Sequence, residues 1–442
     1  MAEQLAPLEV IERTRRGEPV DGPSVESFVR SWIDGTSADS LLAAWCMAAC
    51  LTGLGREQVE ALTRTLIASG DRLELGSLGP TGDVQTTGGV GDTTPLVAAP
   101  LAAALGVRVA TMSGRGLGHC GGAIDKLEAI PGFDADLPLA RFVRQVRDVG
   151  IAVISQTARL TPAGRRLEAL RDATGTTPAA VLVAASVMSR AIAGGAGAIA
   201  LEVTAGHGAH IADPETARET AALMADLAVP WGRRMRWIVS GMDAPRGRCV
   251  GNALEVGEAG EVLRGAGPDD VRELATRLAG DLAEAAGVVE AGEGRAAAAR
   301  ALRDGRALAS AERWVEAQGG AAAVWSDPGA LPTAPVRVDV LAPHDGWVAA
   351  IPARGIGEVA RWLGAGRLHS DQSIDPVAGV EIVARVGDRV AVGDPIAVIH
   401  ARDDWAGERA REMAAEWITV AEEPIERPPL VLGEGGGDAG AS

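Results

Sequence analysis

The sequence contains no tyrosine and only three phenylalanines, although it has ten tryptophans. Alanine, glycine and arginine are abundant instead, a pattern typical of a coding bias, and it indicates no mechanism. Cysteine is scarce too, with four residues among 442. Cys46 and Cys50 stand four apart in a segment predicted as helix, and the four thiols show no metal-ligand spacing. We interpret them as small buried residues of a reducing compartment that need no disulfide.

The sequence also lacks long hydrophobic runs and an excess of positive charge. No stretch of about 18 uncharged apolar residues exists, and Glu3, Glu9 and Glu12 do not fit the layout of a signal peptide. Lysine and arginine number 42 against 59 aspartates and glutamates, a formal net charge of −17. This balance argues against nucleic acids and acidic membranes as partners. We therefore predict a cytoplasmic protein that binds neither nucleic acid nor membranes.

The spacing of apolar residues predicts both helical and α/β parts. Apolar residues three and four apart indicate helices, whereas glycine loops alternating with β-branched runs and helices indicate an α/β domain. The end of the chain is too poor in apolar side chains to fold, so we expect it to be disordered. The pattern is helical in residues 1–75 and 160–193, α/β in residues 76–159 and 194–334, and dominated by short strands in residues 335–427, with the expected disordered tail at residues 428–442. Among the elements expected are helices at residues 23–32, 38–51, 56–69 and 139–149, and strands at 336–341, 348–351, 380–386 and 390–399.

Two glycine-rich runs follow predicted strands. They are Thr86-Thr-Gly-Gly-Val-Gly-Asp-Thr-Thr-Pro95 and Ser113-Gly-Arg-Gly-Leu-Gly-His-Cys-Gly-Gly-Ala-Ile-Asp-Lys-Leu-Glu-Ala-Ile-Pro-Gly-Phe133. Leu96–Met112 between them fits a short helix and then a strand, so both runs can lie at one end of a sheet, where α/β folds bind ligands. Glycine lets the backbone approach a ligand, and free N–H groups can then face an anion. By themselves, the runs fit either a binding site or ordinary tight turns.

The residue order of these runs resembles the signature of the thymidine and pyrimidine-nucleoside phosphorylases. The resemblance continues through Leu170-Arg171-Asp172, Ser186, Gly251–Val256 and residues 344–401. It implies a fold of the α/β plus all-α class, in which a small helical domain and a large α/β domain flank a cleft, with an appended α/β module and a homodimer formed by the helical domain. It also implies a pentosyltransferase that splits the N-glycosidic bond of a pyrimidine nucleoside, with phosphate attacking C1′. We expect no cofactor and no metal.

The base side of the implied site is largely retained. Arg171 and Ser186 stand where the family binds the pyrimidine, and Leu117 matches an apolar contact to the base. Arg190 replaces the family's lysine. Because its planar fork keeps the charge but differs in reach, an altered base preference is expected. An alternative for Arg171 is a plain ion pair with Asp172.

The phosphate side departs from the family pattern. Where the family has Asp-Lys-His-Ser, this chain has Asp83-Val84-Gln85-Thr86, so that the phosphate-binding lysine and the proposed proton donor are both replaced. A serine of the family is Pro95, and its two threonines are Cys120 and Ala123. The positions assigned to the acceptor side are Val84, Thr86, Gly88, Gly89, Thr94, Ser113, Arg115, Cys120 and Ala123. If nothing compensates, we expect the loss of one lysine and two or three hydroxyl partners to weaken phosphate binding by about 4–6 kcal/mol, because such contacts contribute about 1.5–3 and about 1 kcal/mol each.

Two positions are candidates for the missing catalytic group. Gln85 occupies the place of the family's histidine, and His210 or His207 lies in a segment that resembles another family motif. Histidine titrates near neutrality and can donate a proton, although a partly exposed loop histidine is the alternative interpretation. We expect His119 to brace the glycine loop through a backbone hydrogen bond, and Asp125 to help fix that loop through an ion pair.

Three hypotheses about function remain open. The first is glycosyl transfer on a pyrimidine nucleoside with an altered acceptor or a specialised substrate. The second is a weak but ordinary thymidine or uridine phosphorylase, in which loop amides and hydroxyls suffice for phosphate. The third is a non-catalytic homologue that binds a nucleoside.

Overall fold

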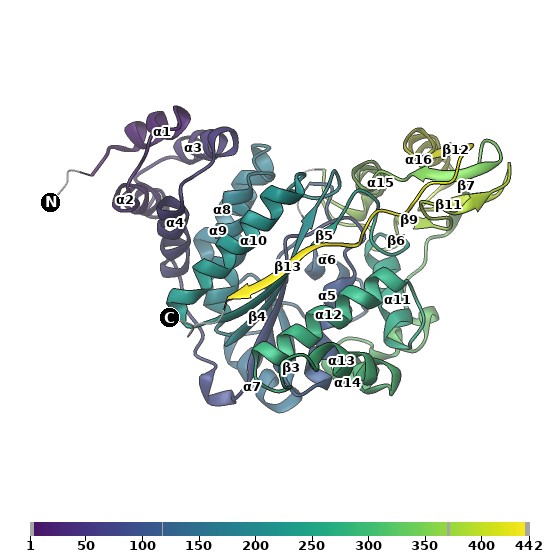
Figure 1. Cartoon of the computed structure of the whole chain (residues 1–442), viewed down its shortest axis with the longest axis horizontal. Helices are drawn as coiled ribbons and strands as arrows, with labels where there is room; N and C mark the ends of the chain where they lie inside the picture. The colour runs from purple at the N-terminus through teal and green to yellow at the C-terminus, as the bar shows by residue number, and fades with distance from the viewer. Residues whose placement is uncertain (1–3, 117, 369–371, 438–442) are drawn as a thin grey trace.

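A bundle of helices forms one end of the protein in the computed structural model, which describes residues 4–116, 118–368 and 372–437 (Figure 1). The helices are α1 Pro7–Arg15, α2 Gly22–Ile33, α3 Asp39–Thr52, α4 Arg56–Ala68, α8 Pro162–Ala173 and α9 Ala180–Gly194. The Asp21 side chain accepts a hydrogen bond from Ser24 N and thereby caps α2. Phe28, Trp32 and Trp45 are buried in one apolar cluster with residues of α9. The helices predicted within residues 23–69 are confirmed, whereas α1 was not predicted.

A six-stranded sheet forms the centre of the α/β domain. Its strand order is β13-β5-β4-β1-β2-β3, with β13 antiparallel to β5 and the other strands parallel. The strands are β1 Thr81–Thr86, β2 Arg108–Ser113, β3 Ile151–Ser155, β4 Ala198–Ala205, β5 Arg234–Gly241 and β13 Val431–Gly437. The helices are α5 Thr94–Ala104, α6 Ala123–Leu127, α7 Leu139–Val149, α10 Pro214–Ala228, α11 Asn252–Leu263, α12 Asp269–Ala285, α13 Gly294–Arg303 and α14 Arg306–Ala317. Strand β4 is buried at every position, as expected for a parallel strand covered on both faces.

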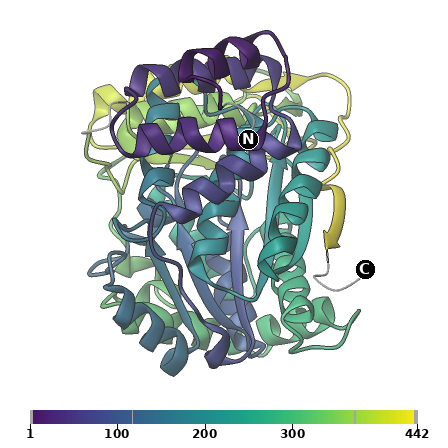
Figure 2. The same cartoon turned by 90° about the vertical axis from the view of Figure 1, so that its left-hand side faces the viewer.

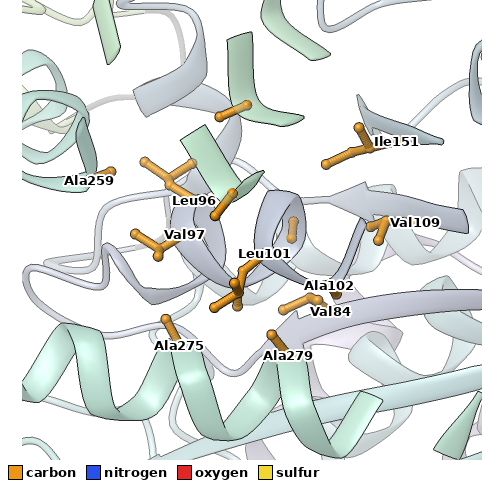
Figure 3. Packing of buried hydrophobic residues seen from close by; sticks show 14 of the residues in the cluster. Val84, Leu96, Val97, Leu101, Ala102, Val109, Ile151, Ala259, Ala275 and Ala279 are labelled. Carbon is orange, nitrogen blue, oxygen red and sulfur yellow. The ribbon is translucent and has the colours of Figure 1, made fainter. Parts of the chain in front are cut away.

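The helix that follows the first glycine run is deeply buried. Leu96 and Leu101 of α5 pack with Val84 of β1 and with Ala275 and Ala279 of α12 (Figure 3). Small side chains on α12 permit this close packing of the helices over β1. The start of α5, and with it the end of the glycine run, is therefore fixed against the sheet.

The two glycine runs begin at the same edge of the sheet, as predicted. Strands β1 and β2 are parallel neighbours, with Gly82 opposite Val109. They end at Thr86 and Ser113, where the two runs begin. Their loops therefore lie at the carboxyl edge, the usual ligand site of this architecture.

The C-terminal module consists of two small antiparallel sheets and two helices. Its elements are β6 Cys249–Val250, β7 Val336–Leu341, β8 Gly346–Ala350, α15 Ala353–Ala360, β9 Gly379–Ile382, β10 Arg389–Val390, β11 Pro395–Ala401, α16 Asp404–Trp417 and β12 Thr419–Ala421. The strand predicted at 390–399 is divided into β10 and β11, because Gly393 has a φ of 85° and makes a turn. No helix of the described residues is long and apolar enough to cross a membrane.

The prediction of a disordered tail is wrong for the residues before 438. Val431–Gly437 form β13, which lies along the edge of the sheet beside β5 (Figures 1 and 2). A strand needs few apolar side chains when it pairs through its backbone with an existing edge. Glu434 forms ion pairs with Arg277 and Arg295, and Gly435 leaves room for the ring of Trp237.

Replacing Gly435 by alanine is expected to lower the free energy of unfolding by about 1–3 kcal/mol, the usual cost of overpacking. An added Cβ would lie 2.5 Å from the ring of Trp237, so the ring or the strand must move. Gly433→Ala is the matched control, since its Cβ would meet the flexible side chain of Arg218 at 3.0 Å. Urea unfolding of the two variants measures the difference, and equal stabilities would contradict the packing described.

Candidate active site

A cleft lies between the helical domain and the carboxyl edge of the sheet. Helices α8 and α9 provide one wall, and the two glycine loops provide the other. The predicted site residues that line it are Thr86, Gly88, Ser113, Arg115, Cys120, Ala123, Arg171, Ser186, Arg190 and His210. Leu117 lies outside the described residues. The predicted cleft thus brings together residues from distant parts of the chain.

Arg171 and Ser186 form a rigid pair on the helical wall. The Nη1 atom of Arg171 donates to Ser186 Oγ at 3.1 Å and to Leu182 O at 3.2 Å, and Nη2 donates to Thr177 O at 2.8 Å. Burial lowers the pKa of the guanidinium, which is 2% exposed. Asp172 instead accepts from Gly118 N, so the alternative of a plain Arg171–Asp172 pair does not hold. The pair presents a fixed charge and a hydroxyl to the cleft.

Arg190 connects the helical wall to the sheet. Its Nη1 atom contacts Glu168 Oε1 at 2.7 Å, and its Nη2 atom donates to Gln85 Oε1 at 3.4 Å. Among the described residues, its buried Nε atom has no hydrogen-bond partner. The Gln85 amide in turn donates to Asp83 Oδ2 and Met112 O. Gln85 therefore does not line the cleft itself, but belongs to a row of polar side chains behind it that connects Arg190 to strands β1 and β2.

The sheet side of the cleft is partly apolar. A small chamber adjoins the cleft and is lined by Val84, Pro95 and Ala123, together with Gln85 and Trp314. Val84, Pro95 and Ala123 are the positions at which the resemblance implied lysine, serine and threonine. The Val84 side chain is 3% exposed and belongs to the main core. Its side chain offers an anion neither a charge nor a hydrogen bond.

The remaining cations near the glycine loops have carboxylate partners. Arg115 contacts Glu128 at 2.5 Å and Asp125 at 3.1 Å. Lys126 is the only lysine of the chain; it contacts Glu255 at 2.7 Å and donates to Asp92 O. Since each positive charge is already balanced nearby, an incoming anion gains less from it.

Smaller polar groups complete the acceptor side. Thr86 Oγ1 donates to Asp92 Oδ2 and accepts from Gly88 N, so the Asp92 carboxylate holds this hydroxyl within the glycine loop. Gly89 and Thr94 do not line the cleft: a Cβ on Gly89 would meet Met242, and Thr94 is fully buried. Two of the predicted acceptor-side residues thus support the loop from behind.

The three histidines of the site differ in environment. His119 Nε2 lies 3.1 Å from Gly208 O, which confirms its bracing role. His207 is exposed and pairs with Asp243, away from the cleft. For His210, burial first, and then the charges of Arg171 and His119, lower the pKa to about 3. Its imidazole is neutral at pH 7 and can hydrogen-bond, but it is a poor proton donor.

Known proteins share this arrangement over most of the chain. Residues 8–70 match the glycosyl transferase family helical bundle domain, residues 78–308 the glycosyl transferase family a/b domain, and residues 347–421 the pyrimidine nucleoside phosphorylase C-terminal domain. The pyrimidine-nucleoside phosphorylase of Geobacillus stearothermophilus is 39% identical over 428 residues, which are 96% of this chain and 98% of the relative. The chain belongs to the pyrimidine-nucleoside phosphorylase family. It is therefore an enzyme of the pentosyltransferase type.

Further relatives agree with this family and fold. The pyrimidine-nucleoside phosphorylase of Bacillus subtilis (strain 168) is 40% identical over 398 residues, covering 89% of this chain and 92% of its own. The crystal structure of anthranilate phosphoribosyltransferase from Thermus thermophilus has a TM-score of 0.56 at 22% identity, covering 70% of this chain and 99% of its own. At that identity, the structure supports the fold alone.

Sequence reasoning missed several cleft residues of this pyrimidine-nucleoside phosphorylase family member, among them Thr177, Val183, Val187 and Glu168. Glu168 lines the cleft from α8 and contacts Arg190 and Gln156. In the sequence it is an ordinary glutamate in an amphipathic helix, where exposure is the usual expectation. Its position three residues before Arg171, nearly one helical turn away, is the only signal that could have indicated it.

Asp83→Asn is expected to change how stability depends on pH. Burial raises the pKa of Asp83 from 3.8 to about 7, although hydrogen bonds from Thr111 and Gln85 oppose the rise. The folded protein therefore holds this proton more tightly than the unfolded chain, so its stability falls as pH rises from about 4 to about 7. The asparagine variant lacks this pH-dependent contribution to the free energy of unfolding, which is at most about 4 kcal/mol. Urea unfolding at pH 5, 6, 7 and 8 compares the two proteins, with the exposed Asp226→Asn as control.

The expected outcome is a pH-dependent difference between the free energies of unfolding of wild type and variant. We expect Asp83→Asn to gain stability relative to wild type up to about pH 7, while Asp226→Asn does not. A pH-independent difference would show that Asp83 does not ionise in this range.

Proposed function

We propose that the protein transfers the pentosyl group of a pyrimidine nucleoside to an acceptor other than tightly bound inorganic phosphate. The relatives are pyrimidine-nucleoside phosphorylases by name, and the helical wall carries the Arg171–Ser186 pair. The family's lysine and histidine are replaced on the opposite wall by Val84 and Gln85. This contrast between the two halves of the cleft supports the proposal.

The single observation that carries it is the pairing of positive charge around the acceptor side, both in the glycine loops and at Arg190 of the helical wall. Arg115, Lys126 and Arg190 line the cleft, and each contacts a carboxylate within 3.1 Å. A phosphate dianion that enters the cleft must either displace a carboxylate from its cation or bind close to that carboxylate. Either cost lowers its affinity, because like charges at short range repel in a poorly hydrated site.

The chemistry follows from the groups that are present. An acceptor oxygen forms a bond to C1′ while the C1′–N bond breaks, and the electron pair passes to the base. Gln85 has no acidic proton and His210 is neutral at pH 7, so neither protonates the base as it leaves. Arg171 and Arg190 stabilise the pyrimidine anion instead. The acceptor releases its hydroxyl proton to solvent, and the anion takes a proton from water.

Base release measured with and without phosphate tests the proposal. The full chain is incubated with uridine, thymidine, cytidine and their deoxy or ribo counterparts, at phosphate concentrations from zero to about 50 mM. We expect one or more nucleosides to release free base at a rate that does not saturate with phosphate. Saturation at low millimolar phosphate would contradict it, and so would the absence of base release with every acceptor supplied.

An ordinary phosphorylase is the second candidate. It is favoured by the names of the relatives and by Thr86 and Ser113, whose hydroxyls still line the cleft. A saturable dependence of the rate on phosphate would identify it. Family membership favours an enzyme over the non-catalytic binding homologue.

We also propose that the helical domain forms a homodimer. Leu8, Met47 and Leu51 of α1 and α3 are 64%, 41% and 78% exposed, unusual values for large apolar side chains. Light scattering measures the mass, and Met47→Glu/Leu51→Glu is expected to give a monomer. A wild-type monomer at micromolar concentration would contradict this.

A further inference from the structure

Glu168 places a carboxylate inside the cleft, at the boundary between its two halves. Its side chain is 12% exposed, with Oε1 at 2.7 Å from Arg190 and Oε2 accepting from Gln156 Nε2 at 2.9 Å. A Cβ on Gly114 would lie 3.7 Å from Arg190 Nη1 and 3.9 Å from Glu168 Oε2. Gly114 directly follows Ser113, a residue of the acceptor side. The ion pair from the base wall therefore lies against the acceptor loop.

We propose that Glu168 determines acceptor specificity by charge. This inference rests on the proposed function and gives a physical cause for it. The Glu168 carboxylate forms an ion pair with Arg190 and repels any second anion that enters the cleft. The cleft then accepts a neutral hydroxyl compound, or water, in preference to inorganic phosphate. Glu168 can accept a hydrogen bond from such a hydroxyl without the repulsion that a phosphate dianion meets at the same carboxylate.

Burial distinguishes Glu168 from Glu128, the carboxylate that pairs with Arg115 near the cleft. The Glu168 and Arg190 side chains are 12% and 8% exposed, whereas Arg115 and Glu128 are 38% and 36% exposed. Water and salt screen the exposed pair, but they screen the buried pair much less. Lys126 and Glu255 are buried too, but Lys126 also donates to Asp92 O and is thus held in the loop. Removing the charge of Glu168 should therefore affect an anion more than removing the charge of Glu128.

Calorimetric titration of the full chain with inorganic phosphate, without nucleoside, tests the inference. The variants are Glu168→Gln, which keeps the shape and removes the charge, and Glu168→Asp, which keeps the charge. Glu60→Gln is the control, since it makes the same charge change on the exposed surface of α4, where Glu60 pairs with Arg56. We expect Glu168→Gln to bind phosphate about tenfold more tightly or better, as expected for one like charge removed at short range. Glu168→Asp and Glu60→Gln should bind phosphate as weakly as wild type.

A double variant shows whether Arg190 is the cation that becomes available. Glu168→Gln/Arg190→Gln should lose the gain in phosphate affinity, and the gain of the single variant should shrink as salt increases. Circular dichroism verifies that each variant is folded; should Glu168→Gln not fold, Glu168→Ala replaces it in the same titration. A folded variant of either kind with wild-type phosphate affinity would overturn the inference and leave the proposed function intact. Tight phosphate binding by wild type would instead overturn the proposed function.

Discussion

Arg171→Lys is expected to lower kcat/KM for the nucleoside by about 30- to 1000-fold, a loss of about 2–4 kcal/mol of transition-state stabilisation. Lysine keeps the charge, but it cannot reach Thr177 O, Leu182 O and Ser186 Oγ together as the arginine does. The ammonium would settle on some of these acceptors, and the charge facing the base would move. Initial rates of base release at several nucleoside concentrations give kcat and KM separately.

The control for this substitution lies on the same helix. Arg165→Lys changes an exposed residue of α8, and we expect kcat/KM to stay within about twofold of wild type. The stability of both variants should be measured by urea unfolding, because Arg171 also binds three backbone carbonyls. A folded Arg171→Lys protein with unchanged kcat/KM would contradict a role of Arg171 in binding the base.

Val84→Lys/Gln85→His is expected to create phosphate-dependent base release, raising the rate at about 10 mM phosphate by about 10²–10³-fold. The lysine returns one charge-assisted contact of about 1.5–3 kcal/mol, and the histidine returns a proton donor near the departing base. The double substitution is also expected to lower the free energy of unfolding. Val84 lies in a core of apolar side chains (Figure 3), so an ammonium there is poorly solvated until phosphate binds.

The expected signature is therefore a folded state that phosphate stabilises. The double variant should melt below wild type in phosphate-free buffer and regain part of the loss as phosphate is added. Val84→Met serves as the control, since it adds length without charge and should show neither effect. A folded double variant whose rate does not respond to phosphate would mean that the two replacements are not the cause of weak phosphate use.

Several elements could be predicted because their signals are local. The order of residues in the two glycine runs identified the family, and the alternation of strand and helix between them placed both loops at one edge of the sheet. Arg171 and Ser186 were identified by resemblance alone. The cleft lining confirms where they lie, while their contacts to a base stay a prediction.

Other elements could not be predicted because their partners are distant. Strand β13 is glycine-rich and has no apolar pattern. It forms because its backbone pairs with the edge strand β5, and because Gly435 has no side chain that would collide with the ring of Trp237. The proton-donor role of His210 depends on its surroundings, and burial beside Arg171 lowers its pKa to about 3. No periodicity in the sequence carries that information.

The sequence by itself determined the family and the fold class, because these depend only on residue identity and order. The tertiary structure decided how the remaining charges are used. Glu168 and Arg190 are 22 residues apart in the chain, and only the packing of α8 beside α9 brings the carboxylate onto the guanidinium. Whether a positive charge is available to an anion depends on which carboxylate folding places beside it, and that is a property of the assembled cleft.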